Sequence, residues 1–371
     1  MSQTLALLLD AYRDLNSRRM FWIVLILSTL VAASFAAIGL TPTGFEIFKW
    51  KFSSYFFNSN VVSPGDFYKG IFLNWGIDLW LSSIAAALAL ISTASLFPDF
   101  IAAGAIDLYL SKPISRWRLF LTKYFCGLLF VALQIACFCA ACFLVIGIRG
   151  NAWEPGIFLA VPIVVLFFSY LYCFCVLIGV WTRSTVAAVL LTLLFWVGVV
   201  CLHTTEVTLL TFKLTDHEAA HRIDLQIADT EKSIVHVQNI SATRPTTRTS
   251  ARLSTLHSQL ADQQTRRSNF HGAYDRPHEI FYDSMTVLPK TAETVALLHR
   301  MLISSARLQR VAADQDDPNQ NRVDLNGNPV PVAELQAELN RRTVAWIIGT
   351  SVAFEVVVLT LAIWIFCRRD Y

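Results

Sequence analysis

Residues 98–123 read PDFIAAGAIDLYLSKPISRWRLFLTK, and this stretch decides how the rest of the chain is organised. It separates two long apolar runs, and its acidic and basic side chains keep it out of hydrocarbon. Pro98 and Asp99 favour the first turn of a helix, and the Lys112-Pro113 pair ends it. The stretch is either a solvated loop or a short helix that lies across the membrane face and binds a soluble partner.

The composition is typical of a protein that crosses a membrane several times. Of the 371 residues, 55% are hydrophobic and 15% are charged. A soluble domain has roughly 45–50% apolar and about 25% charged residues. The formal net charge of +3, without a basic run, gives no reason to expect nucleic acid as a partner.

Six apolar runs are long enough to cross the hydrocarbon core, which takes about 20 residues. Lys and Arg are more numerous in the short segments on the side that holds both chain ends, so that side is expected to be cytoplasmic. We therefore predict an all-α integral membrane protein with six transmembrane helices, both termini inside, and a helical extracytoplasmic domain between spans five and six. The runs are 21–40, 70–96, 124–148, 156–181, 186–210 and 344–367.

These runs divide the chain into four segments. Residues 1–20 form an amphipathic helix, expected in the membrane interface or packed on protein. Residues 21–212 hold spans one to five with the cytoplasmic loop 97–123. Residues 213–343 form the extracytoplasmic domain, and residues 344–371 the sixth span and a cytoplasmic tail.

The extracytoplasmic segment carries helical apolar spacing at 220–237 and again at 253–270, with Pro245 between them. This pattern predicts an antiparallel helical hairpin, whereas a disordered polar insert is the alternative. Further helices are expected within 282–310, with a break at Pro289, and at 333–342.

The eight cysteines all lie in or at the ends of apolar runs, which argues against a disulfide framework. Cysteine in such surroundings is usually a small packing residue. The less favoured interpretation is a soft-metal site formed by Cys137, Cys139, Cys142, Cys173 and Cys175.

Three polar side chains within the runs are candidates for function: Glu355, Gln134 and Asp78. An ionised side chain at mid-membrane costs at least about 2.5–3.5 kcal/mol, and the runs contain no Lys or Arg to pair with Glu355. We expect Glu355 to be protonated, or hydrogen-bonded to Gln134 or to a Ser or Thr. It is either a residue of a substrate path or subunit interface, or a packing hydrogen bond.

Motifs for catalysis are absent from the sequence. It contains no glycine-rich phosphate-binding loop, no His-Glu-x-x-His and no Gly-x-Ser-x-Gly. We expect no catalytic, cofactor-binding or metal site in this chain.

The N-terminal helix at 7–19, the loop at 97–117 and the six-span plan together resemble the ABC-2-type permeases of ATP-driven transporters. The resemblance is to the branch associated with multicopper-enzyme maturation. It covers 1–212 and 344–371 but not the hairpin at 213–275. It implies an inner-membrane permease that forms a homodimer or heterodimer and works with separate cytoplasmic ATPase subunits, which bind ATP and Mg²⁺.

In such permeases the first cytoplasmic loop is a coupling helix that sits in a groove of the ATPase. Here the helix has an apolar face at roughly helical spacing, which we expect to dock on the ATPase: Phe100, Ile101, Ala105 and Leu108. A membrane scaffold that transmits motion to the extracytoplasmic hairpin and its partner, without transport, is the competing function. The coupling residues implied by the resemblance are Pro98, Asp99, Phe100, Ile101, Gly104, Asp107, Leu108, Lys112, Pro113, Arg116 and Arg118.

Overall fold

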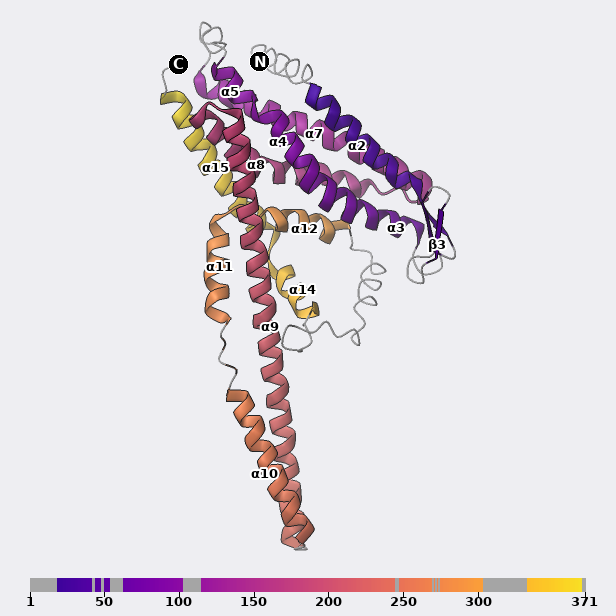
Figure 1. Ribbon diagram of the computed structural model, residues 1–371, viewed down its shortest axis with the longest axis vertical. Coiled ribbons are helices and arrows are strands. Elements are labelled where there is room, and N and C mark those ends of the chain that lie inside the picture. The colour runs from indigo at the N-terminus through magenta and orange to yellow at the C-terminus, as the bar shows by residue number, and fades with distance from the viewer. Residues whose placement is uncertain are drawn as a thin grey trace. The chain divides into compact units, whose positions relative to one another are not determined.

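The structure is a computed structural model in which nearly all described residues are helical (Figure 1). The N-terminal helix predicted at 1–20 lies almost wholly outside the described residues. The residues described are 19–41, 44–47, 50–53, 63–102, 115–243, 247–268, 270, 272, 274–302 and 332–368.

Six helical segments among these residues are long and apolar enough to cross a membrane, which confirms the six predicted runs as helices. The second segment is composite, because its middle part, η1, has the wider π-helical hydrogen-bonding pattern. Short helix α5 (Leu96–Ala102) follows it. The segments are α2 (Arg19–Ala37), α3 (Pro64–Ile71) with η1 (Phe72–Ala85) and α4 (Ala86–Ala94), α7 (Arg116–Arg149), η2 (Pro155–Leu159) with α8 (Ala160–Thr182), α9 (Thr185–Thr243), and α15 (Val344–Arg368).

The described residues are almost entirely helical, as predicted, and the exception lies between the first two spans, where three short strands form an antiparallel sheet. Strands β1 (Ile38–Thr41), β2 (Gly44–Ile47) and β3 (Trp50–Ser53) pair in sequence order. Ile38 lies opposite Ile47, which in turn lies opposite Trp50. The first helix therefore ends before the apolar run does. Four-residue strands are too short to show a clear alternating pattern in the sequence.

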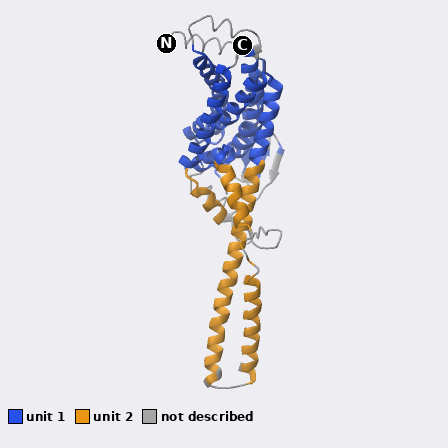
Figure 2. Ribbon diagram, turned by 90° about the vertical axis from the view of Figure 1, so that its left-hand side faces the viewer, with its two compact units in different colours: residues 1–200, 287–316, 344–371 blue, residues 201–286, 317–343 orange. Residues whose placement is uncertain are grey.

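The chain forms two compact units (Figure 2). Unit 1 comprises residues 1–200, 287–316 and 344–371, and unit 2 comprises 201–286 and 317–343. These units differ from the predicted segments, in which residues 213–343 form one domain. Helix α12 (Thr291–Leu302) falls in that range but belongs to unit 1 and not to the unit that contains the hairpin. This helix buries Leu298 and its apolar neighbours and packs against α8, η1 and α15.

Helix α8 is the centre of unit 1, since it packs against α15, α7, α12 and α4. Its Tyr172 is fully buried and stacks on Tyr124 of α7, with ring centroids 5.1 Å apart. Gly127 makes this approach possible, because a Cβ atom there would lie 2.5 Å from the Tyr172 hydroxyl oxygen.

Unit 2 contains the predicted hairpin, formed by α9 and α10 (Thr247–Ser268). Ile234 and Val237 are buried along its length, and the Arg267 Nε atom lies 2.7 Å from an oxygen of Asp224. One detail differs from the prediction: α9 continues without a break from the fifth apolar run into the first arm. Helix α14 (Val332–Arg341) confirms the helix predicted at 333–342. Helix α11 (Asp275–Val287) begins before the predicted segment 282–310, of which 303–310 lie outside the described residues.

A buried ion pair joins three segments of unit 2. Glu206 of α9 is fully buried, and one of its carboxylate oxygens accepts a hydrogen bond of 2.5 Å from Arg342, just after α14. The Nε2 atom of His278, on α11, lies 3.2 Å from the same oxygen. The Arg342 guanidinium also lies over the ring of Tyr282, 5.5 Å from its centroid.

Arg342→Ala is expected to lower the apparent melting temperature of the purified protein clearly. Removing one partner of a buried ion pair costs about 3–5 kcal/mol, because the other charge is left without compensation. Arg341→Ala is the matched control, because the Arg341 side chain is 79% exposed whereas the Arg342 side chain is 8% exposed. The exposed ion pair between Arg341 and Glu338 is worth about 0–1 kcal/mol. Equal shifts for the two variants would mean that the Glu206–Arg342 pair does not stabilise unit 2.

Candidate functional site

The described part of the stretch 98–123 begins as helix α5 and resumes at the first turn of α7. Helix α5 starts at Leu96, so Pro98 lies in its first turn, as predicted. The side chain of Asp99 is outside the described part of the structure. So are Gly104, Asp107, Leu108, Lys112 and Pro113.

Phe100 and Ile101 do not form the exposed docking face expected of them. They are 6% and 7% exposed, because α5 packs against α8 and α7. The Lys123 ammonium nitrogen of α7 lies 5.0 Å from the centroid of the Phe100 ring. The apolar face of α5 is therefore part of the core of unit 1. Ile101→Asp would disrupt this core and could not serve as a clean test of docking.

The exposed side chains near α5 are basic and aromatic. Trp117 is 49% exposed, and the Arg118 guanidinium lies 5.4 Å from the centroid of its ring. Arg116 donates a 3.3 Å hydrogen bond to the backbone carbonyl of Cys367, near the end of α15. At that end, the Arg368 guanidinium lies 4.5 Å from the ring centroid of the exposed Trp364. We call the five side chains of Arg116, Trp117, Arg118, Trp364 and Arg368 the basic-aromatic surface.

Glu355 lies within α15 and is bonded to two other helices of unit 1. The Tyr124 hydroxyl of α7 donates to Oε1 of Glu355 over 2.7 Å. The hydroxyl oxygen of Ser169, on α8, lies 2.9 Å from Oε2. The expected hydrogen bond to a Ser or Thr is thus confirmed, and Tyr124 is a partner that the sequence analysis missed.

Gln134 is not a partner of Glu355, so that part of the prediction is wrong. Its side chain is buried, and its amide nitrogen lies 3.5 Å from the Phe21 carbonyl oxygen of α2. Tyr124 and Gln134 are ten residues apart on one helix, which corresponds to about 15 Å along its axis. Gln134 therefore belongs to a different level of unit 1.

Asp78 is on η1, and one of its carboxylate oxygens lies 3.0 Å from the Nε2 atom of His299 on α12. This contact links the second apolar segment to a helix that precedes the sixth. Asp78 was identified from its place in an apolar run, whereas nothing in the sequence pattern identified His299 as its partner.

No group of three or more His, Cys, Asp or Glu side chains suited to a metal ion is found among the described residues. The candidate thiols are buried, except Cys137, which is exposed. The part of the chain that is described therefore gives no geometric support to the soft-metal interpretation.

Comparison of the chain with protein-family models, with curated proteins and with solved structures finds no match in any of the three. The resemblance to ABC-2-type permeases rests on sequence motifs alone.

Substitution of Glu355 is expected to depend on whether the new side chain can hydrogen-bond. Glu355→Gln should leave the protein as stable as the wild type, since the amide can accept from Tyr124 and donate to Ser169. Glu355→Leu should lower the apparent melting temperature modestly, because it removes two hydrogen bonds worth about 0.5–1.5 kcal/mol each. Tyr124 and Ser169 then keep the backbone carbonyls of Ser169 and Leu166 as acceptors. If Leu is tolerated as well as Gln, the carboxyl does not hold the three helices together. If Gln keeps stability but abolishes activity, the carboxyl group itself is functional.

Proposed function

We propose that this chain is the membrane-spanning subunit of an ATP-driven transporter of the ABC-2 type. It couples a separate cytoplasmic ATPase to export or to work on the cell envelope. The observation that carries this proposal is the basic-aromatic surface, which lies where α7 begins and α15 ends. The described residues include six helices long and apolar enough to cross a membrane. Exposed Trp and Arg side chains of this kind are enriched among residues that dominate the energy of protein interfaces.

Phe100 and Ile101 have a transmitting role in this proposal and not a docking role. Because they are packed between α5 and α8, a push on α5 moves the central helix of unit 1 directly. Docking is assigned to Arg116, Trp117 and Arg118. The first turn of α7 carries all three, so a partner bound there acts on a helix that reaches Glu355 through Tyr124.

The proposed setting is the inner cell membrane, with both termini in the cytoplasm. Two permease subunits, identical or related, associate with two ATPase subunits that bind ATP and Mg²⁺. The sequence supports this division of work, since it has the apolar spans of a permease and no phosphate-binding loop.

A second candidate is a subunit that transmits motion to an extracytoplasmic partner and transports nothing. The unbroken helix α9 favours it, because 59 residues continue from the fifth apolar run into the hairpin. A single continuous helix of that kind is a direct mechanical connection.

The topology is tested by labelling two cysteine variants in intact cells with a thiol reagent that does not cross the membrane. Ser115 and Ser258 are both exposed, one before α7 and the other on α10. In a background without the native cysteines, Ser258→Cys is expected to react from outside and Ser115→Cys only after the cells are broken. Reaction of both from the same side would contradict the six-span topology, in which three spans separate the two positions.

The coupling role is tested by replacing Trp117 and Arg118 together with Ala. We expect about a tenfold or larger loss of ATPase that co-purifies with the permease, since each 1.4 kcal/mol of lost interface energy is tenfold in affinity. Trp50→Ala is the control, because Trp50 is 77% exposed in the loop expected on the opposite side. ATPase recovery at wild-type level by the double variant would remove the coupling role from this surface.

A further inference from the structure

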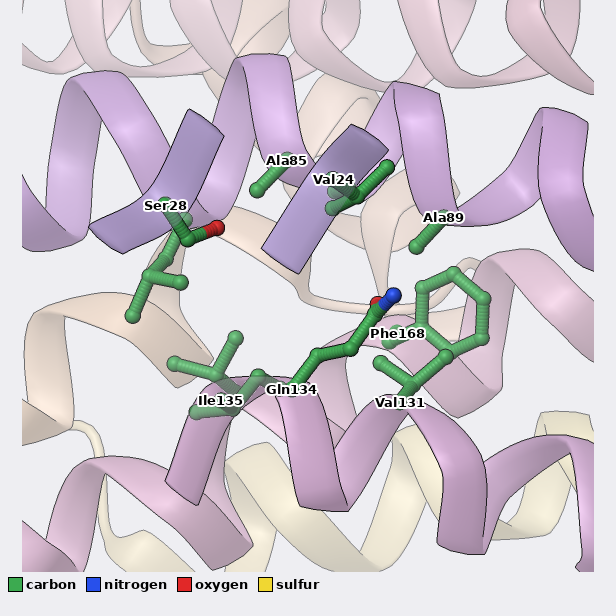
Figure 3. Close-up of a pocket in the computed structure, with 11 residues that line it drawn as sticks. Val24, Ser28, Ala85, Ala89, Val131, Gln134, Ile135 and Phe168 are labelled. Atoms are coloured by element: carbon green, nitrogen blue, oxygen red, sulfur yellow. The ribbon is translucent and has the colours of Figure 1, made fainter. Parts of the chain in front are cut away.

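A cavity lies between the helices of unit 1, bounded by α2, η1, α4, α7 and α8 (Figure 3). The centres of water molecules can occupy about 20 Å³ of it. A cavity needs roughly 10–15 Å³, measured in this way, to hold one water molecule. Its wall is apolar apart from two side chains, Ser28 of α2 and Gln134 of α7.

The hydrogen-bonding capacity of Gln134 is not satisfied by the described residues. Its side chain is 95% buried, as the residue is 5% exposed. Its one hydrogen bond to them is the 3.5 Å contact of the amide nitrogen with the Phe21 carbonyl, at the long limit for such a bond. The amide oxygen can accept two hydrogen bonds, and it accepts none from the described residues. The amide group points into the cavity (Figure 3).

Ser28 lines the same cavity, and its hydroxyl group can donate a hydrogen bond. The residue is 3% exposed, and its hydroxyl oxygen accepts a 3.2 Å hydrogen bond from the Trp80 indole nitrogen. Among the described residues, no acceptor receives the hydrogen of this hydroxyl. The cavity wall therefore carries one acceptor, the Gln134 amide oxygen, and one donor, the Ser28 hydroxyl, and neither is paired with a described residue.

We propose that this cavity is a water-binding site with Ser28 and Gln134 as its polar partners. Water bound there accepts from the Ser28 hydroxyl or donates to the Gln134 amide oxygen. Apolar cavities of proteins stay empty, but cavities that are roomy enough and lined by several polar groups hold water. Hydrocarbon supplies no alternative partner for these groups.

The site has a consequence for movement of the helices. Ala85 and Ala86, which both line the cavity, mark the place where π-helical η1 changes to α-helical α4. Local π-helical geometry is rare and is often found at functional sites. Water there bonds to α2 or to α7, and these bonds can be exchanged without unpacking a side chain.

The test is X-ray footprinting of the full-length protein in lipid nanodiscs, because radicals formed from a bound water oxidise the side chains beside it. Phe168 lines the cavity and Phe138 does not, while both are 1% exposed. We expect Phe168 to be oxidised several-fold faster than Phe138. Equal rates for the two rings in the wild-type protein would overturn the proposal.

Two variants separate a bound water from water that leaks in from outside. Ala85→Leu fills the cavity and keeps both polar groups, and Gln134→Met removes the amide at nearly unchanged volume. Each should lower the oxidation rate of Phe168 to that of Phe138, without changing the rate of Phe138. A rate for Phe168 that stays high in both folded variants would also overturn the site. The wild-type comparison decides the matter if a variant does not fold.

Discussion

Within apolar spans, each polar side chain needs a partner inside the protein, because hydrocarbon offers none. Glu355 meets this constraint through Tyr124 and Ser169, and the three residues come from three different helices. The constraint thus fixes how α15, α7 and α8 lie against one another, in addition to their apolar packing. Aromatic stacking of Tyr124 on Tyr172 then fixes α7 on α8 at the same level. A half-buried carboxyl thus lies beside a pair of stacked, buried tyrosine rings in unit 1.

The Glu355 carboxyl is connected to the surface by two consecutive residues of α7. Lys123 lies under the ring of Phe100 on α5, and Tyr124 donates to Glu355. The coupling proposed above therefore runs from α5 to the Glu355 carboxyl through adjacent residues of one helix. The burial of Phe100 and Ile101 belongs to the same packing of α5 on α7 and α8.

The sequence predicted the six long helices and the hairpin well, because apolar runs and helical spacing leave few alternatives over 20 residues or more. It did not predict which apolar faces are covered by the chain itself. The spacing of Phe100 and Ile101 is the same whether a partner or α8 covers them. Gln134 and Glu355 do not meet, because ten residues of α7 separate Gln134 from Tyr124, which is the partner that Glu355 uses. His299 and Arg342 were missed because pairing across distant segments leaves no local signal.

The two proposed functions make different demands on the polar groups of unit 1. Transport needs a path along which polar groups succeed one another through the spans. Glu355, Gln134 and Asp78 instead have separate partners, namely Tyr124 and Ser169, Phe21, and His299. In the structure they are three sites and not one line, so the proposed transport requires the spans to rearrange. The proposed transmission of movement requires only an unbroken helix between the fifth apolar run and the hairpin, and α9 is one helix of 59 residues.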